Sequence, residues 1–386
     1  MKTDERKKKK ILIAGAWVWP WYQEACATAL EELGCLVERF SWFDDFYRWE
    51  RTRVEPVFKT GWAALQNRLL MGPTLWRINR RLINTARKAS LDVIWFYNCP
   101  LIFPKTLQTL RHFLPDALLI QYINDNPFSN HLWPDYWRYL KRSIPYFDLH
   151  FIYRQSDQVA FQKAGAKKTY LLRSYFIPKD DFRVPLEEVD QQYRSEVLFA
   201  GHYEDDGRLE KLEAIARSGF SLKIFGGGWV GAQKKMSTDS PLRFQFPITP
   251  VVGEKYRQAI CGAKIALCFL SKINSDTYTR RNFQIAAMQT FMLSEYSVDL
   301  EGLFREGVEA EFFRSKAELI DKIRYYLKYE HKREQIARKG FERVLKDGHD
   351  VRSRMQTFLK RIQQEKPALP IPFSTLIQER SSLEYV

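Results

Sequence analysis

The stretch Asn274–Glu295, NSDTYTRRNFQIAAMQTFMLSE, decides the fold of the second half of this chain. It follows a short apolar run, Lys264–Leu270 (KIALCFL), which predicts a buried parallel strand. The stretch itself predicts a polar loop, a helix of about two to three turns and a second strand, FMLSE. A loop that enters a helix presents free backbone N–H groups, and Arg280 and Arg281 stand at that entrance. The pattern fits a phosphate site, and it equally fits an ordinary strand–loop–helix–strand unit with solvated arginines.

The composition predicts a globular protein of two domains that attracts anionic partners. The 386 residues are enough for two cores, and 45% of them are hydrophobic. Lys and Arg total 61 against 46 Asp and Glu, and the net charge of +15 draws nucleotide diphosphates, nucleic acid or acidic lipid headgroups. Aromatic residues make up 15% of the chain, and they can stack on sugars, pack in a core or contact a membrane, so their number does not favour one function.

Cysteine, histidine and hydropathy patterns predict a cytoplasmic protein without a metal site. The five cysteines form no C-x-x-C pair, and the six histidines show no H-x-x-x-H spacing. No apolar run approaches the roughly eighteen residues of a membrane helix. The basic Lys7–Lys10 and the apolar run after it imitate a signal peptide, but this run continues into an amphipathic helix and a second strand. We therefore interpret it as the first strand of an α/β domain.

The first half alternates predicted strands and helices. The strands are expected at Ile11–Trp17, Leu36–Trp42, Asp92–Asn98, Ala117–Asp125, Asp148–Tyr153 and Lys168–Arg173. Between them we expect an amphipathic helix over Trp21–Leu33, stopped by Gly34, and a basic helical segment over Val57–Leu91 that Gly72 and Pro73 divide. The β–α–β opening is Rossmann-like, but it lacks G-x-G-x-x-G and so does not predict dinucleotide binding.

Domain boundaries follow from composition. We predict a Rossmann-like N-terminal domain over residues 1–176, a polar linker over 177–194, a second Rossmann-like domain over 195–365 and a tail over 366–386. In the second domain the strand at Ser195–Gly201 and the run LKIF each lead into glycines, which let a ligand approach the backbone. Trp229–Val251 is expected to be irregular. Helices are expected at Glu254–Cys261, Lys316–Tyr329, His331–Lys346 and Val351–Gln364.

A set of motifs in the second half has the spacing of a known family. The motifs are VLFAGHYEDDGR (Val197–Arg208), FGGGW (Phe225–Trp229), Asn274-x-Asp276-x-x-Thr279-x-Arg281-x-Phe283-Gln284-Ile285-x-Ala287, FMLSE, DLEGLFREGVEAEFF and YYLKYEHKREQIARKGFERV (Tyr325–Val344). They resemble the nucleotide-sugar half of CgeB-like glycosyltransferases, members of the GT-B superfamily, and the first half resembles this family more loosely. The resemblance implies an α/β GT-B fold in which two Rossmann-like domains face a cleft, with C-terminal helices and a tail that packs on the first domain.

The resemblance also implies which residues bind a donor. The donor would be a nucleotide-diphosphate sugar, with no further cofactor. The implied binding residues are Gly201, His202, Arg208, Gly227, Asn274, Thr279, Arg281 and Gln284. Arg281 and Arg208 would meet the phosphates, Gly201 would allow close approach, and His202 is either a cleft residue or a surface histidine. This chain departs from the family at Gln284, where a glutamate that contacts the ribose is usual, and at Gln289, where a glycine is usual.

Three carboxylates are candidates for catalytic roles. Asp276 lies eight positions before Gln284, at the spacing where related enzymes carry a carboxylate that contacts the donor. Asp125 lies in a polar turn after a predicted strand, where open α/β sheets place ligands, and the alternative for it is an Asx turn. Glu295 ends FMLSE and either faces the donor or caps a helix that starts near Asp299.

The leading prediction is a retaining, metal-independent GT-B glycosyltransferase with a glycan or lipid-linked hydroxyl acceptor, as in polysaccharide biosynthesis. Because no D-x-D motif is placed for a metal, cationic side chains and helix N–H groups must stabilise the leaving diphosphate. A binding protein that has lost turnover is the first alternative, favoured by Gln284 and Gln289. A nucleic-acid-modifying or nucleic-acid-binding protein is a weaker one, because the chain lacks a known recognition module. The basic segments, Lys7–Lys10 and Arg77–Lys88, predict attachment to the inner face of an anionic membrane.

Overall fold

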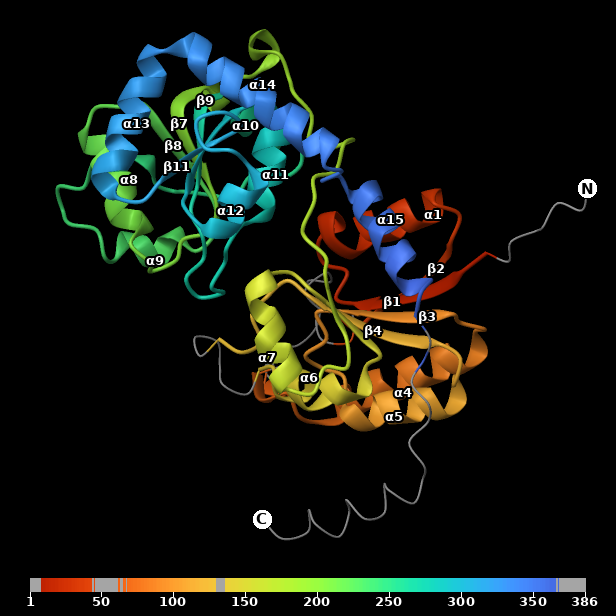
Figure 1. Ribbon diagram of the computed structural model, residues 1–386. Helices are drawn as coiled ribbons and strands as arrows, with labels where there is room; N and C mark the ends of the chain where they lie inside the picture. The colour runs from red at the N-terminus through yellow and green to blue at the C-terminus, as the bar shows by residue number, and fades with distance from the viewer. Residues whose placement is uncertain are drawn as a thin grey trace, which may run out of the picture. The chain divides into compact units, whose positions relative to one another are not determined.

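The structure, a computed structural model, describes residues 8–43, 45, 62, 65–66, 68–129, 136–365 and 367 (Figure 1). The chain forms two compact units, and we call Met1–Arg173 with Met355–Val386 unit 1 and Ser174–Arg354 unit 2. The sequence analysis grouped residues 355–365 with the second domain, whereas the structure groups them with the first. The tail predicted at 366–386 lies, apart from Pro367, outside the described residues. Each unit contains one parallel sheet with helices, as the predicted fold class requires.

Unit 1 is built on a six-stranded parallel sheet in the order β2-β1-β3-β4-β5-β6. The strands are β1 (Lys10–Gly15), β2 (Leu36–Ser41), β3 (Val93–Tyr97), β4 (Leu118–Ile123), β5 (Leu149–Ile152) and β6 (Thr169–Leu171), one for each predicted strand. In β3 the side chains alternate between the two faces. Ile94 and Phe96 enter a core with residues of α4 and α5, whereas Trp95 stacks on Phe358 of α15 with ring centroids 4.5 Å apart. Both faces are therefore covered, which explains the continuous apolar runs of the sequence.

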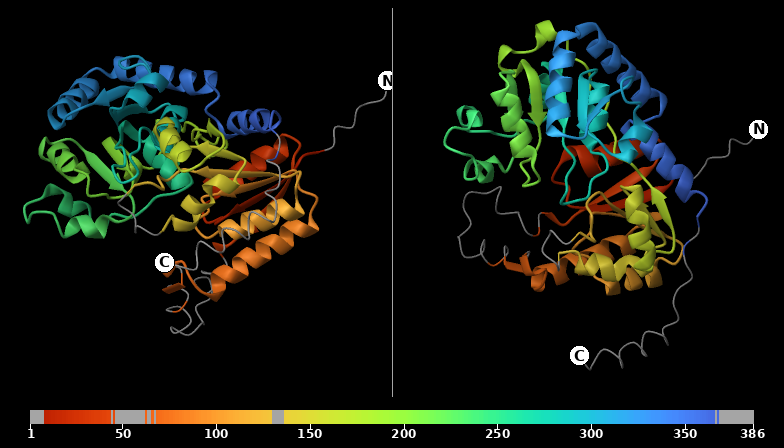
Figure 2. Two further views of the ribbon diagram at one scale, coloured as in Figure 1. Left: turned by 60° about the horizontal axis from the view of Figure 1, so that its bottom comes forward. Right: turned by 60° about the vertical axis from the view of Figure 1, so that its left-hand side comes forward.

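The helices of unit 1 are α1 (Ala25–Glu32), α4 (Pro73–Lys88), α5 (Pro104–Phe113), α6 (Arg138–Ser143), α7 (Gln158–Lys163) and α15 (Val351–Ile362), the last of which starts in unit 2. A π turn at Pro20–Glu24 replaces the first turn of the helix expected at Trp21–Leu33. The predicted stop is confirmed, because Gly34 has a φ of 88°. α4 begins directly after Gly72, with Pro73 in its first turn, as predicted for the break. α4 and α5 lie side by side along one face of the sheet (Figure 2).

Unit 2 is built on a five-stranded parallel sheet in the order β11-β10-β9-β7-β8. The strands are β7 (Ser195–Ala200), β8 (Leu222–Phe225), β9 (Ala263–Cys268), β10 (Phe291–Glu295) and β11 (Glu311–Phe313). β11 was not predicted as a strand, because its three residues are too few to show a periodicity. In the stretch that opened the sequence analysis, the strand–loop–helix–strand order is confirmed.

The helices of unit 2 are α8 (Arg208–Arg217), α9 (Trp229–Gln233), α10 (Glu254–Cys261), α11 (Arg280–Ala287), α12 (Val298–Leu303), α13 (Lys316–Lys328) and α14 (Glu330–Lys346). α9 lies in a segment that was expected to be irregular. It starts at the buried Trp229 after Gly228, whose left-handed φ of 79° the glycine run makes possible. α8 and α13 contact each other and share a core with inward-facing residues of β7 and β9. Among the described helices, none combines the length and the apolar character that crossing a membrane requires.

Candidate functional site

The order of the strands places a ligand site in unit 2. The connections reverse direction between β7 and β9, and open parallel sheets bind ligands beyond the carboxyl ends of the strands at such a point. The loops that follow β7 and β9 meet there. Ser271 Oγ donates to Glu204 Oε2 at 2.6 Å, and Lys272 Nζ donates to the carbonyl oxygen of Asp206 at 2.8 Å. The two loops therefore form one connected rim above the sheet.

Arg281 lies against this rim with much of its hydrogen-bonding capacity unused. Its Nη2 lies 3.5 Å from the backbone oxygen of Phe269, and its side chain also contacts that of Cys268. Its Nε is buried and has no hydrogen-bond partner in the described part of the chain. Gly201 lies beside the guanidinium: a Cβ at Gly201 would touch the Arg281 Cζ at 3.4 Å, an ordinary contact, but would clash with the ring of Phe199 at 2.7 Å. Arg281 and Gly201, predicted from separate motifs, are thus brought together.

The surroundings of Arg281 favour its charged form. Burial opposes the charge, but Cys268, Tyr256 and Asp276 more than offset it, and the pKa of Arg281 is raised. Asp276 thus acts electrostatically on Arg281, and its backbone N–H donates to the carbonyl oxygen of Ser271 at 2.8 Å. A charged guanidinium with a buried and unpaired N–H suits an anionic ligand, because such a donor gains most from a charged acceptor.

Arg208, the second predicted phosphate ligand, is fully engaged within its own loop. It is 2% exposed. Its Nε and Nη2 donate to both carboxylate oxygens of Asp206 at 2.8 and 2.6 Å, and its Nη1 donates to the carbonyl oxygen of His202 at 2.5 Å. These contacts hold the loop after β7 in shape, and they favour a structural role for Arg208 in this structure.

The glycines after β8 allow close backbone contact with the loop after β7. A Cβ at Gly226 would stand 1.8 Å from the carbonyl oxygen of Gly201, which also accepts a hydrogen bond from Trp229 Nε1 at 3.1 Å. A Cβ at Gly227 would stand 3.3 Å from Nε2 of the exposed His202. The first close approach is between two parts of the backbone, so Gly226 is required by packing, whereas Gly227 lies under the His202 ring.

Thr279 and Asn274 shape the loop that leads into α11. Thr279 is the N-cap of α11, and its backbone N–H donates to Asn282 Oδ1 at 2.7 Å in a capping box. The backbone N–H of Asn274 donates to Ser271 Oγ at 3.2 Å. Both predicted residues therefore lie at the proposed rim, and the contacts of Thr279 are those of a helix cap.

Gln284 lies one turn after Arg281 on α11 and belongs to a polar network. Its Nε2 donates to Asp181 Oδ1 at 2.8 Å, and its Oε1 accepts from Tyr256 Oη at 3.4 Å. Asp181 is 5% exposed, also accepts from the backbone N–H of Ile177 at 2.8 Å and pairs with Arg280 at 3.4 Å. The sequence analysis missed Asp181 and Tyr256, because they lie 103 and 28 residues from Gln284 in the chain.

Glu295 does not cap the helix that follows it. Ser297 caps α12, because its Oγ accepts from the backbone N–H of Leu300 at 3.0 Å, so that alternative was wrong. Glu295 instead accepts from the backbone N–H of Leu270 at 3.1 Å and lies 3.6 Å from Lys211 Nζ. Lys211, one turn into α8, is a further cation near the rim, and no motif in the sequence indicated it.

Asp125 belongs to unit 1 and lies at the carboxyl end of β4. Its Oδ2 accepts from Asn98 Nδ2 at 3.3 Å, and burial raises its pKa, although Arg154 opposes the rise. The Asx turn predicted as its alternative role is made by Asn126, whose Oδ1 accepts from the backbone N–H of Phe128 at 2.9 Å. Asp125 thus marks a polar cluster at a strand end of unit 1.

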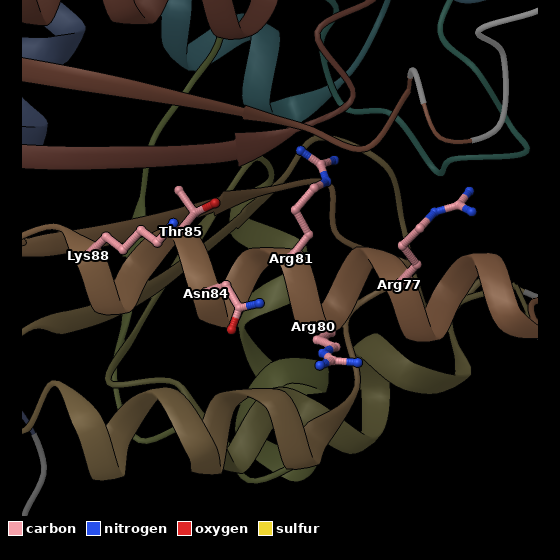
Figure 3. Close-up of a pocket in the computed structure, with 6 residues that line it drawn as sticks. All are labelled: Arg77, Arg80, Arg81, Asn84, Thr85 and Lys88. Atoms are coloured by element: carbon pink, nitrogen blue, oxygen red, sulfur yellow. The ribbon is translucent and has the colours of Figure 1, made fainter.

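A basic pocket of about 310 Å³ lies on α4 of unit 1. It is lined by Arg77, Arg80, Arg81, Asn84, Thr85 and Lys88, which repeat at helical spacing (Figure 3). Asp45 pairs with Arg77 at 3.5 Å and with Arg81 at 2.5 Å. Arg80 and Lys88 are exposed. This pocket coincides with the basic segment predicted to face anions.

Comparisons with known proteins agree with this architecture. Residues 208–360 match the glycosyl transferase-like family. None of the curated proteins compared with the sequence matches it. The structure is similar to Anabaena Alr3699/HepE in complex with UDP and glucose, with 14% identity over 92% of this chain and 100% of that chain and a TM-score of 0.64. It is also similar to sucrose-phosphate synthase from Thermosynechococcus elongatus, with 11% identity over 92% and 99% of the two chains and a TM-score of 0.69. The chain therefore has the fold of GT-B glycosyltransferases, and residues 208–360 of it match a glycosyl transferase-like domain.

Proposed function

We propose that this protein is a glycosyltransferase whose unit 2 binds a nucleotide-diphosphate sugar. The observation that carries the proposal is Arg281, a guanidinium with a buried, unpaired Nε beside Gly201 at the switch point of the sheet. The HepE structures contain UDP, UDP-glucose, or UDP with glucose, and UDP is therefore the first nucleotide to test here. The motifs that resemble those of the CgeB-like family support membership of that group and a role in polysaccharide synthesis.

The proposed reaction transfers the sugar to an acceptor hydroxyl and releases the nucleoside diphosphate. Arg281 and the first N–H groups of α11 would stabilise the charge that develops on the leaving diphosphate. Gln284 lies on the same face of α11, one turn later, and would accept a hydrogen bond from a ribose hydroxyl. Asp276 would contact the sugar or the ribose. We infer a retaining, metal-independent reaction with a glycan or lipid-linked acceptor.

Calorimetry with UDP and measurement of UDP release from UDP-glucose together test this proposal. Binding with release supports a transferase. Binding without release, also in the presence of glycan or lipid-linked acceptors, supports the alternative that Gln284 suggests, a nucleotide-sugar-binding protein without turnover. A protein that binds no nucleoside diphosphate and is retained by DNA in a salt-dependent manner would refute both.

We also propose that α4 holds the protein at an anionic membrane, where a lipid-linked acceptor is presented. The exposed Arg80 and Lys88 stand on α4, and exposed apolar residues lie in its first turn and just before it. Trp76 is 71% exposed, Met71 60% and Leu69 50%. Exposed aromatic and apolar side chains beside basic ones suit the headgroup region of a bilayer.

Reversal of the charge of Arg80 and Lys88 tests the membrane proposal. Each basic residue near an anionic surface contributes about 1 kcal/mol, so Arg80→Glu with Lys88→Glu should lower partitioning to anionic vesicles about 30-fold. The matched control reverses two exposed lysines elsewhere in unit 1, Lys163→Glu with Lys167→Glu. Equal loss in both double variants would show that only net charge matters, and would remove α4 as the contact.

A further inference from the structure

The direction of the Gln284 amide is fixed by its neighbours. A carboxylate can only accept, so Asp181 Oδ1, at 2.8 Å, must face Nε2 of Gln284. Oε1 therefore points to the other side, where Tyr256 Oη is its partner at 3.4 Å. A contact of that length leaves Oε1 with room for a better donor. Gln284 thus presents an acceptor, and not a donor, on the side of Tyr256.

Asp181 is itself held in place. Its Oδ2 accepts from the backbone N–H of Ile177 at 2.8 Å and faces Arg280 Nη2 at 3.4 Å. The carboxylate is 5% exposed, and burial raises the pKa of Asp181, although Arg280, Ile177 and Gln284 oppose the rise. Its two oxygens are therefore assigned to different partners, with Oδ1 reserved for Gln284.

This arrangement accounts for the glutamine at position 284. A glutamate there would place a second carboxylate about 2.8 Å from Asp181. Two carboxylates at that distance cannot both stay ionised, so one would have to bind a proton or the network would open. Gln284 has the shape of glutamate, and it satisfies Asp181 as a donor while keeping one oxygen as an acceptor.

We propose that Asp181 is a positioning residue that turns the Gln284 oxygen toward the ribose of the nucleotide and so sets a preference for ribonucleotides. The proposal rests on the proposed function, because it assigns the ligand group that Gln284 meets. Position 284 of α11 has no carboxylate, and Asp181, from the segment of unit 2 that precedes β7, places one beside the Gln284 amide instead. Gln284 and Asp181 then act together as an oriented acceptor.

Exchange of the two side chains tests this. In Asp181→Asn, the asparagine oxygen should stay with the two donors, Ile177 and Arg280, and its NH₂ group should face Gln284. The Gln284 amide would then have to turn over and present a donor to the ribose. In the double variant Asp181→Asn/Gln284→Glu, the same NH₂ group would donate to Glu, and a charged acceptor would face the ribose again.

The readout is the ratio of affinities for UDP and for 2′-deoxy-UDP or 3′-deoxy-UDP. A neutral hydrogen bond gives a preference of about two- to tenfold for UDP over one deoxy analogue in the wild type. The preference should disappear in Asp181→Asn and return in the double variant. The exposed neighbour offers the control Asp180→Asn, which should keep the wild-type ratio.

The inference alone would be overturned by a wild-type protein that binds UDP without preference for ribose, or by an Asp181→Asn variant that keeps the full preference. A double variant that is folded and binds UDP but shows no recovered preference would do the same. Failure of the wild type to bind UDP or other nucleoside diphosphates would instead refute the proposed function, and this inference with it. Thermal melts of each variant separate lost preference from lost folding.

Discussion

Replacement of the two adjacent arginines at the start of α11 should give opposite results. Arg280 is committed to the fold, because it pairs with the buried Asp181 at 3.4 Å and donates to the carbonyl oxygen of Tyr175 at 3.2 Å. Arg281 makes weaker contacts, at 3.5 Å with the oxygen of Phe269 and with the side chain of Cys268, and its Nε has no partner in the described part of the chain. We therefore expect Arg281→Ala to reduce nucleotide binding and Arg280→Ala to reduce stability.

The structure sets the size of both effects. A charge-assisted hydrogen bond contributes about 1.5–3 kcal/mol, so Arg281→Ala should weaken UDP binding by about 10- to 150-fold. Arg280→Ala leaves the Asp181 carboxylate with two of its donors, and loss of the third should cost about 2 kcal/mol. For a unit of this size that corresponds to a decrease in Tm of about 4–8 °C.

Calorimetry with UDP and thermal melts of both variants test these expectations. The two changes remove the same side chain from neighbouring positions, so each variant serves as the control for the other. The reasoning would be refuted if Arg281→Ala bound UDP with wild-type affinity, or if its Tm fell as far as that of Arg280→Ala. The first result would mean that Arg281 serves only the fold.

Two further predictions concern stability. His150 is buried with Nε2 3.0 Å from the carbonyl oxygen of Ile144, and burial lowers its pKa from 6.5 to about 4. The folded state then binds fewer protons than the unfolded state, so the stability present above pH 6.5 should fall, by up to about 3 kcal/mol, as the pH decreases toward 4. Denaturant melts of wild type and His150→Asn at pH 7, 5 and 4 measure this loss. If the free energy of unfolding fell equally with pH in both proteins, His150 would not be its cause. Gln289 has a left-handed φ of 53°, so Gln289→Gly should stabilise unit 2 by about 0.5–1 kcal/mol, after subtraction of the flexibility that glycine adds to the unfolded chain. A lower Tm of this variant would show that the contact of Gln289 with Arg183, at 3.5 Å, matters more than the backbone strain.

The fold could be predicted because buried parallel strands have a strong local pattern. Apolar runs such as Asp92–Asn98 and Lys264–Leu270 are covered on both faces, and each marked its strand directly. Short strands and helices were harder to predict. β11 has three residues, and α9 has five that follow a glycine run, so neither shows a full period. The placement of the chain from Met355 in unit 1 depends on Phe358 packing on Trp95, a contact between distant residues.

The candidate site could be predicted only where one stretch carries it. Arg281 and Thr279 were identified because the entrance to α11 is local, and the structure brings Gly201, predicted from a separate motif, beside Arg281. The contacts of Arg208 with Asp206 could not be foreseen, since a basic residue at a helix start equally suggests a ligand. Lys211 gave no signal, because one lysine on a charged helix face is ordinary.

The two glutamines that depart from the family pattern have different physical consequences. At position 289 the backbone has the left-handed φ that suits glycine, and we therefore expect Gln289 to cost stability. At position 284 the glutamine replaces the usual glutamate, and its amide donates to the Asp181 carboxylate, which a glutamate would repel. A departure from a motif therefore does not by itself indicate loss of function. Function can be retained where the surrounding residues supply hydrogen-bond partners for the new side chain, and at Gln284 both the oxygen and the nitrogen of the amide have such partners.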